Sequence, residues 1–197
     1  MVSFTPAIGQ NRDTPAAIVL GKTHRAAELG PRVLAIRLAK IACVAAIGLD
    51  MALVAFGNIT DYGTNFGFVT EVLDMAELPA ASQIHWRAVT SPTLHAAFYD
   101  AIIAAEVVVA ALCVLGAFAM TRQMRAKAAR FHAAKSFAVA GLTLGFLLYE
   151  AGFVAVGGEW FGMWQARGFD AVSSAFRALM TMLGVLIFVA MKDEELS

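Results

Sequence analysis

The chain has 197 residues, of which 59% are hydrophobic and 15% are charged, and its 15 Lys and Arg residues balance its 15 Asp and Glu residues. Soluble domains carry roughly 45–50% apolar and about 25% charged residues, so this composition excludes an ordinary water-soluble protein. It indicates an integral membrane protein with lipid bilayer as its solvent. The basic stretch at 121–132 is short and fits membrane topology or anionic lipid headgroups better than it fits nucleic acid.

Residues 1–32 mix charges with proline and glycine and predict a cytoplasmic N-terminal tail. Four apolar stretches follow, at 33–56, 96–120, 133–156 and 171–191. Each approaches or exceeds the ~20 residues that an α-helix needs to cross ~30 Å of hydrocarbon. None alternates as a barrel strand would. We therefore predict an all-α membrane protein with four transmembrane helices in an up-down-up-down bundle.

The connections between these helices differ in length. Residues 57–95 form a long outer loop, in which apolar residues near Phe66–Leu73 and Gln83–Val89 have spacing that predicts short helices. The connections 121–132 and 157–170 are short. The predicted transmembrane domain therefore spans 33–191, and residues 192–197 form a cytoplasmic C-terminal tail.

The basic residues orient the helices. Twelve of the 15 Lys and Arg residues flank the start of the first span, the second connection or the end of the fourth span. Such an excess marks the cytoplasmic face of a membrane protein. Trp86, Trp160 and Trp164 gather on the opposite side, where aromatic rings occupy the headgroup region. We expect a multi-pass protein of the bacterial inner membrane with both termini in the cytoplasm.

Each predicted span carries one ionisable residue at a similar depth, roughly 10–15 Å below the outer surface at 1.5 Å per residue. Residues four or seven apart share one face of an α-helix. Tyr99 therefore shares a face with Glu106 on the second span, and Thr181 shares one with Arg177 on the fourth. The predicted intramembrane polar cluster is Asp50, Glu106, Glu150, Arg177, Tyr99 and Thr181. Charges inside a bilayer are expensive and mark functional sites by default. Two interpretations remain open: an ion pair that holds the bundle together, or a proton or cation site that uses the surplus of carboxylates.

Other chemistries have little support in the sequence. His95 and His132 lie near opposite surfaces, which excludes a transmembrane haem held by paired histidines. No metal-ligand spacing, phosphate-binding loop or hydrolase motif is present. We predict no metal and no cofactor, although a bound lipid is compatible with the composition.

A resemblance to a known family rests on three parts of the sequence: the stretch from Asn58 to Val69, the His85–Val89 run, and the later Pro92, Tyr99 and Glu106. Together these residues resemble the bacterial family of predicted small integral membrane proteins called domain of unknown function 2165. The resemblance implies a four-span inner-membrane protein and brings no established activity. It also implies that the outer loop is the characteristic surface of the family. With the adjacent histidine, the candidate interaction surface is Asn58, Asp61, Tyr62, Trp86, Arg87 and His95.

Two functions follow from these features. The absence of catalytic motifs and the patterned outer loop favour a non-enzymatic accessory or interaction module of a membrane complex, whose oligomeric state the sequence does not define. The alternative is a proton- or cation-coupled channel or small transporter that uses the polar cluster.

Overall fold

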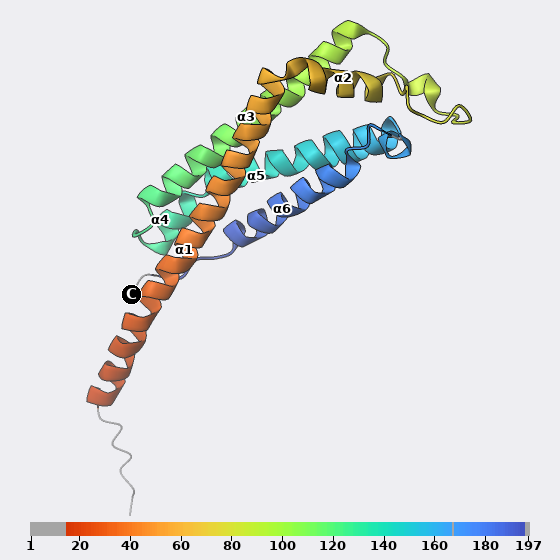
Figure 1. Ribbon diagram of the computed structural model, residues 1–197. Helices are drawn as coiled ribbons and strands as arrows, with labels where there is room; N and C mark the ends of the chain where they lie inside the picture. Colours follow the sequence, from red (N-terminus) through yellow and green to blue (C-terminus); the bar gives the residue numbers. More distant parts are fainter. Residues whose placement is uncertain (1–14, 167, 196–197) are drawn as a thin grey trace, which may run out of the picture.

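The computed structural model describes residues 15–166 and 168–195, with side chains from residue 30 onward. Within this part of the chain the protein is helical and has no strand. Four helical segments are long and apolar enough to cross a membrane: Gly30–Thr60, Pro92–Arg122, Ala128–Trp160 and Val172–Ala190. They run alternately up and down in chain order (Figure 1). The predicted fold class, an all-α membrane protein with four membrane-spanning helices, is confirmed.

Helix α1 runs from Pro15 to Thr60 and is much longer than its apolar stretch. The part of the predicted tail from Pro15 to Arg32 is therefore helical and continuous with the first span. Pro15 suits the first turn of a helix, and the Ala, Leu, Lys, Arg and Glu residues that follow are strong helix formers. The rest of the predicted tail, residues 1–14, lies outside the described residues.

The second and third spans also extend past their apolar stretches, whereas the fourth matches its stretch closely. Helix α3 covers Pro92–Arg122, with Pro92 in its first turn, where the missing N–H costs no hydrogen bond. The third span combines α4 (Ala128–Ala133), α5 (Ser136–Leu147) and η2 (Leu148–Trp160). Helix α6 covers Val172–Ala190.

The segment η2 is a π-helix, in which hydrogen bonds join residues five apart instead of four. Residues four or five apart therefore share a face of η2, whereas an α-helix aligns residues three, four or seven apart. This change of register alters which side chains of the third span face their neighbours.

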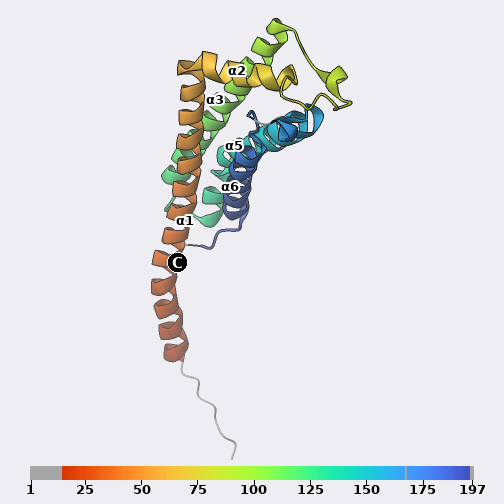
Figure 2. The ribbon, with the colours of Figure 1, turned by 45° about the vertical axis from the view of Figure 1, so that its right-hand side comes forward.

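The connection between α1 and α3 is partly helical, as predicted. It contains α2 (Tyr62–Leu73) and a 3₁₀ turn, η1 (His85–Arg87). Helix α2 turns away from α1 and lies across the end of the bundle (Figure 2). A second 3₁₀ turn, η3 (Met163–Gln165), follows η2. We call this end of the molecule the α2 end, and the opposite end, where Arg37, Lys40 and Lys135 are buried, the basic end.

Glycines allow the helices to pack closely. A Cβ atom on Gly116 of α3 would lie 2.5 Å from the backbone nitrogen of Ala138 of α5. A Cβ on Gly141 would lie 2.9 Å from Cys113 Sγ, and one on Gly145 would lie 2.7 Å from Met182 Sδ. The Gly141-xxx-Gly145 pair is thus a close helix contact, as its spacing suggests.

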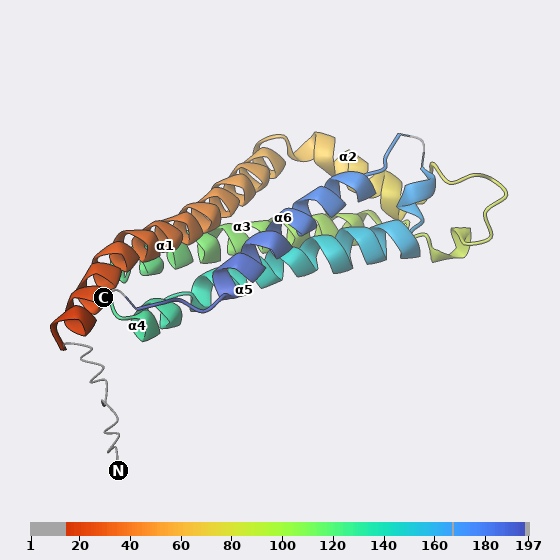
Figure 3. The same cartoon turned by 90° about the horizontal axis from the view of Figure 1, so that it is seen from below.

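The helices do not stay together along their whole length. Helix α1 packs against α3, α3 against α5, and α5 and η2 against α6. Near the basic end α6 approaches α1, and toward the α2 end the two helices diverge (Figures 1 and 2). Seen from below, α6 and η2 lie to one side of the α1–α3 pair (Figure 3). One side of α6 is therefore left uncovered in its α2-end half.

Candidate functional site

A buried polar contact inside the spans joins Glu106 of α3 to Asn58 of α1. Glu106 is buried, with 2% of its surface exposed, and its Oε2 accepts a hydrogen bond from Asn58 Nδ2 at 2.7 Å. Tyr99 lies seven residues earlier on the same stripe of α3, is equally buried, and donates from its hydroxyl to the Asn58 carbonyl at 3.1 Å. The two elements thus share a compact polar contact, which we call the Asn58 site. The sequence assigned Asn58 to the loop surface and Glu106 to the intramembrane cluster, whereas the structure brings them together.

Aromatic rings cover this contact from α2. The Tyr62 ring packs edge-on against the Tyr99 ring with centroids 4.7 Å apart, and Phe66 stacks on Tyr62 at 5.7 Å. Tyr62 also donates to Asp100 Oδ1 at 2.9 Å, and this hydrogen bond raises the pKa of the Tyr62 phenol above its ordinary value. Tyr62 therefore fixes α2 on α3.

His95 is not part of an exposed surface, which corrects the prediction. It is only 3% exposed, and its Nε2 contacts the Val89 carbonyl and lies 3.4 Å from Asp74 Oδ1. These partners place His95 in a contact between the start of α3 and the preceding loop. The histidine was included because of its sequence position beside that loop, and position alone does not reveal burial.

The remaining members of the predicted polar cluster lie apart from Glu106. Asp50 and Arg177 are exposed, and Glu150 is half-buried. Arg177 donates to Ser174 Oγ at 2.8 Å, and Thr181 donates back to the Arg177 carbonyl. Across residues 30–166 and 168–195, no ion pair joins any of the four charged residues to another.

Two features of the helices account for this separation. Helix α6 buries Ala175, Leu179 and Met182, so Arg177 and Thr181 are left on its uncovered side. In the third span the α-helix changes to a π-helix at Leu148, which shifts the register of the residues that follow, Glu150 among them.

The rest of the predicted loop surface divides into two regions. Asp61 is exposed beside the Asn58 site. Trp86, which is 72% exposed, and Arg87 form a cluster with Trp160 at the end of η2. The Arg87 guanidinium lies 4.8 Å from the Trp160 ring centre and 5.3 Å from that of Trp86, and its Nη1 donates to the Trp160 carbonyl at 3.2 Å. This cluster joins the loop to the third span.

A second polar site, at the basic end, was not predicted. Lys40 Nζ lies 2.8 Å from Asp193 Oδ1, and Lys135 contacts Oδ2 of the same carboxylate. Burial opposes ionisation of Asp193, but hydrogen bonds from Lys135 and Lys40 outweigh it and hold the pKa of Asp193 below its usual range. Arg37 is fully buried and donates to the carbonyls of Met124, Ala126 and Glu194.

This site anchors the segment after α6 to α1 and α5. A signal for it was present in the sequence, because Arg37, Lys40 and Lys135 all lie within predicted apolar stretches. The positive-inside rule accounts for these residues without a buried partner, so the sequence predicts the membrane orientation and not the site.

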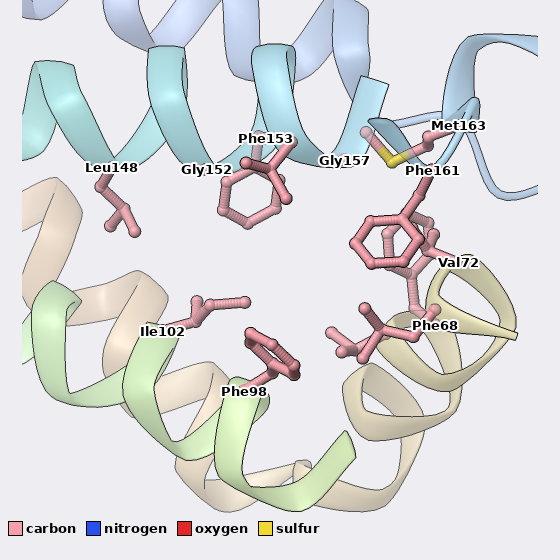
Figure 4. Close-up of a pocket in the computed structure, with 13 residues that line it drawn as sticks. Phe68, Val72, Phe98, Ile102, Leu148, Gly152, Phe153, Gly157, Phe161 and Met163 are labelled. Carbon is pink, nitrogen blue, oxygen red and sulfur yellow. The ribbon is translucent and has the colours of Figure 1, made fainter. Parts of the chain in front are cut away.

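An apolar cavity of about 290 Å³ lies between α2, α3 and η2 near the α2 end. Figure 4 shows Phe68 and Val72 of α2, Phe98 and Ile102 of α3, and Gly152 and Phe153 of η2 around it. Every residue that lines it is apolar.

Among the described residues, no group of three or more His, Cys, Asp or Glu side chains could hold a metal ion.

Comparison with known proteins places the chain in a family. No curated protein and no solved structure matches it. The family described as predicted small integral membrane protein, domain of unknown function 2165, matches residues 36–192 and thus covers most of the first span and all of the other three. The chain belongs to this family of small integral membrane proteins.

Proposed function

We propose that this chain is a non-enzymatic module of a membrane complex, joined by another membrane helix along the uncovered side of α6. Arg177 carries the proposal. It lies inside a span, is exposed, and has no acidic partner among the described residues. A charged side chain inside the bilayer costs on the order of 3 kcal/mol by insertion scales. A partner helix with an acidic side chain at this depth would offset that cost.

The side of α6 that carries Arg177 suits a helix partner. At the basic end, Lys40 of α1 lies over the Phe188 ring, so this side of α6 is turned toward α1 there. Helical spacing continues the same side along α6 to the α2 end, where α1 has diverged. The uncovered α6 stripe consists of Ser174, Arg177, Thr181 and Gly184. Small and hydroxyl residues at such spacing let membrane helices approach closely.

The same proposal includes an orientation. The basic end would face the cytoplasm of a bacterial inner membrane and the α2 end the opposite side, because most Lys and Arg residues lie at the basic end. A reporter enzyme that works only in the cytoplasm should show activity when it is fused after residue 197. Activity of an exported reporter at that position would contradict the orientation.

The alternative, proton- or cation-coupled transport, has weaker support. It requires Asp50, Glu106, Glu150 and Arg177 around one site. In the structure Glu106 is hydrogen-bonded to Asn58, whereas Asp50 and Arg177 are exposed. The separation of these groups favours the interaction module.

Photocrosslinking in native membranes tests the proposal. A photoreactive amino acid at Thr181 should capture a membrane protein, and the same group at Phe118, a 59% exposed position of α3, serves as the control. Arg177→Gln should abolish the Thr181 crosslink, and Arg177→Lys should retain much of it. Equal crosslinking from Thr181 and Phe118, or a Thr181 crosslink unaffected by Arg177→Gln, would overturn the proposal. A crosslink to a second copy of this chain would identify the partner as a homo-oligomer.

A further inference from the structure

We infer that the apolar cavity binds one acyl chain of a membrane phospholipid, whose phosphate is held by Arg87 at the α2 end. This lipid site is independent of the proposed partner surface, because the cavity lies between α2, α3 and η2 and the partner surface lies on α6.

The lining of the cavity selects an apolar ligand. Its walls are aliphatic, aromatic or glycine residues and offer no side-chain hydrogen-bond donor or acceptor. Small-molecule sites usually have ~300–1,000 Å³ and a few polar groups that orient the ligand. A cavity of about 290 Å³ without such groups suits a flexible hydrocarbon chain better than a ring that carries carbonyl oxygens.

The π-helix forms one wall of the cavity. Leu148, Gly152 and Gly157 line it at intervals of four and five residues, the spacing that a π-helix places on one face. Gly152 has open space beside it, since a Cβ there would meet only Leu148 Cδ1, at 3.9 Å. The absence of a side chain at Gly152 therefore contributes directly to the cavity.

The cavity opens sideways toward the bilayer. Phe98 of α3 and Val156 of η2 both line it, and each is 47% exposed. Both belong to membrane-spanning helices, so the solvent at this opening is lipid. Acyl chains are the molecules that surround such an opening at the highest concentration.

Hydrogen bonds join Arg87 and the residues after it to segments that line the cavity. Its guanidinium binds the carbonyl of Trp160, the residue before Phe161, which lines the cavity. Two residues after Arg87, the Val89 N–H binds the carbonyl of Leu73, another lining residue.

The cluster around Arg87 places a cation at headgroup level. Trp86 and Trp160 have the aromatic character of the membrane interface. A guanidinium has five N–H donors in a geometry that matches phosphate. In Arg87 the contacts to the Trp160 and Glu159 carbonyls use only Nη1, and Nε is buried, so Nη2 remains to donate to a phosphate. One phospholipid can therefore place its phosphate at Arg87 and one chain in the cavity below.

Photolabelling in vesicles tests this inference. The full-length protein is reconstituted in phosphatidylcholine vesicles that contain phosphatidylglycerol with a diazirine on one acyl chain, and labelled peptides are mapped by mass spectrometry. We expect labels on the α3 and η2 segments that line the cavity. Gly152→Leu should reduce this labelling at least tenfold, because the leucine side chain fills the cavity. Gly57→Leu is the matched control, since a Cβ at Gly57 meets nothing within 4 Å.

Two further arms complete the test. Arg87→Gln should lower the labelling roughly tenfold, the ratio that corresponds to one hydrogen bond to a charged group. If Gly152→Leu does not fold, Ile102→Phe fills the cavity from the opposite wall. Equal labelling of the Gly152→Leu and Gly57→Leu proteins would overturn the site, and labelling unaffected by Arg87→Gln would overturn the headgroup assignment. Displacement of the probe by excess quinone, but not by unlabelled phosphatidylglycerol, would also refute the inference.

Discussion

Replacement of Asp193 by Asn tests whether the basic end holds the segment after α6 against the bundle. Lys40 and Lys135 both bind this carboxylate, and all three side chains are at most 3% exposed. Removal of one partner from a buried ion pair costs about 3–5 kcal/mol, because the remaining charge stays buried without compensation. The Met191 carbonyl still accepts hydrogen bonds from both lysines. We therefore expect Asp193→Asn to lower the free energy of unfolding by about 3 kcal/mol, the lower end of that range.

The measurement is unfolding by a denaturing detergent in mixed micelles, followed by circular dichroism. Glu194→Gln is the matched control, because the Glu194 side chain is exposed and only its backbone carbonyl binds Arg37. We expect the control to change the free energy of unfolding by less than about 0.5 kcal/mol. Equal stability of the two variants would refute the assignment of Asp193 as the anchor.

The same site should make stability depend on pH. The pKa of Asp193 is lower in the folded protein than its ordinary value, so ionised Asp193 stabilises the fold above the unfolded-state pKa of about 3.9. That contribution is lost as the pH falls through the folded-state pKa. Between pH 7 and acid pH, unaltered protein should therefore lose more stability than Asp193→Asn. Parallel loss in both proteins would contradict the linkage.

Two further predictions concern packing and the Asn58 site. Gly116→Ala should destabilise the protein by about 1–3 kcal/mol, because the new Cβ would lie 2.5 Å from the backbone of Ala138. Gly57→Ala is the control and should not destabilise the protein, because a Cβ at Gly57 lies in open space. Thermal unfolding in detergent measures both, and equal effects would contradict the close helix contact. Asn58→Ala should lower the free energy of unfolding by about 1–2 kcal/mol, because it removes the hydrogen bond to Glu106. When Glu106 is already replaced by Ala, the same Asn58→Ala change should cost about 1 kcal/mol less. Additive losses in this double-mutant cycle would show that the two side chains are not coupled.

The number and approximate position of the spans follow from the sequence alone. Lipid cannot hydrogen-bond the backbone, so each apolar stretch of sufficient length must form a helix on its own, without help from distant residues. The same local reasoning located the short helices of the loop at 57–95.

The orientation of each side chain was decided only by tertiary structure. In a soluble helix, polar residues mark the solvent side, but a membrane helix has apolar residues on both its lipid face and its protein face. Glu106 and Arg177 therefore look equivalent in the sequence, yet one is buried against Asn58 and the other is exposed. The π-helix from Leu148 to Trp160 changes the register again, so α-helical spacing does not give the direction in which Glu150 faces.

The contacts between distant segments were also beyond the sequence. Lys40 and Lys135 could be counted as basic residues, but their shared partner, Asp193, lies 153 residues from Lys40 in the chain and becomes a neighbour only after folding. The apolar cavity likewise depends on how α2 crosses α3 and η2, which no single segment encodes. Because the bilayer acts on each segment separately, the sequence alone determined the four membrane helices. The two polar sites and the cavity arise from packing among helices, and only the tertiary structure decided them.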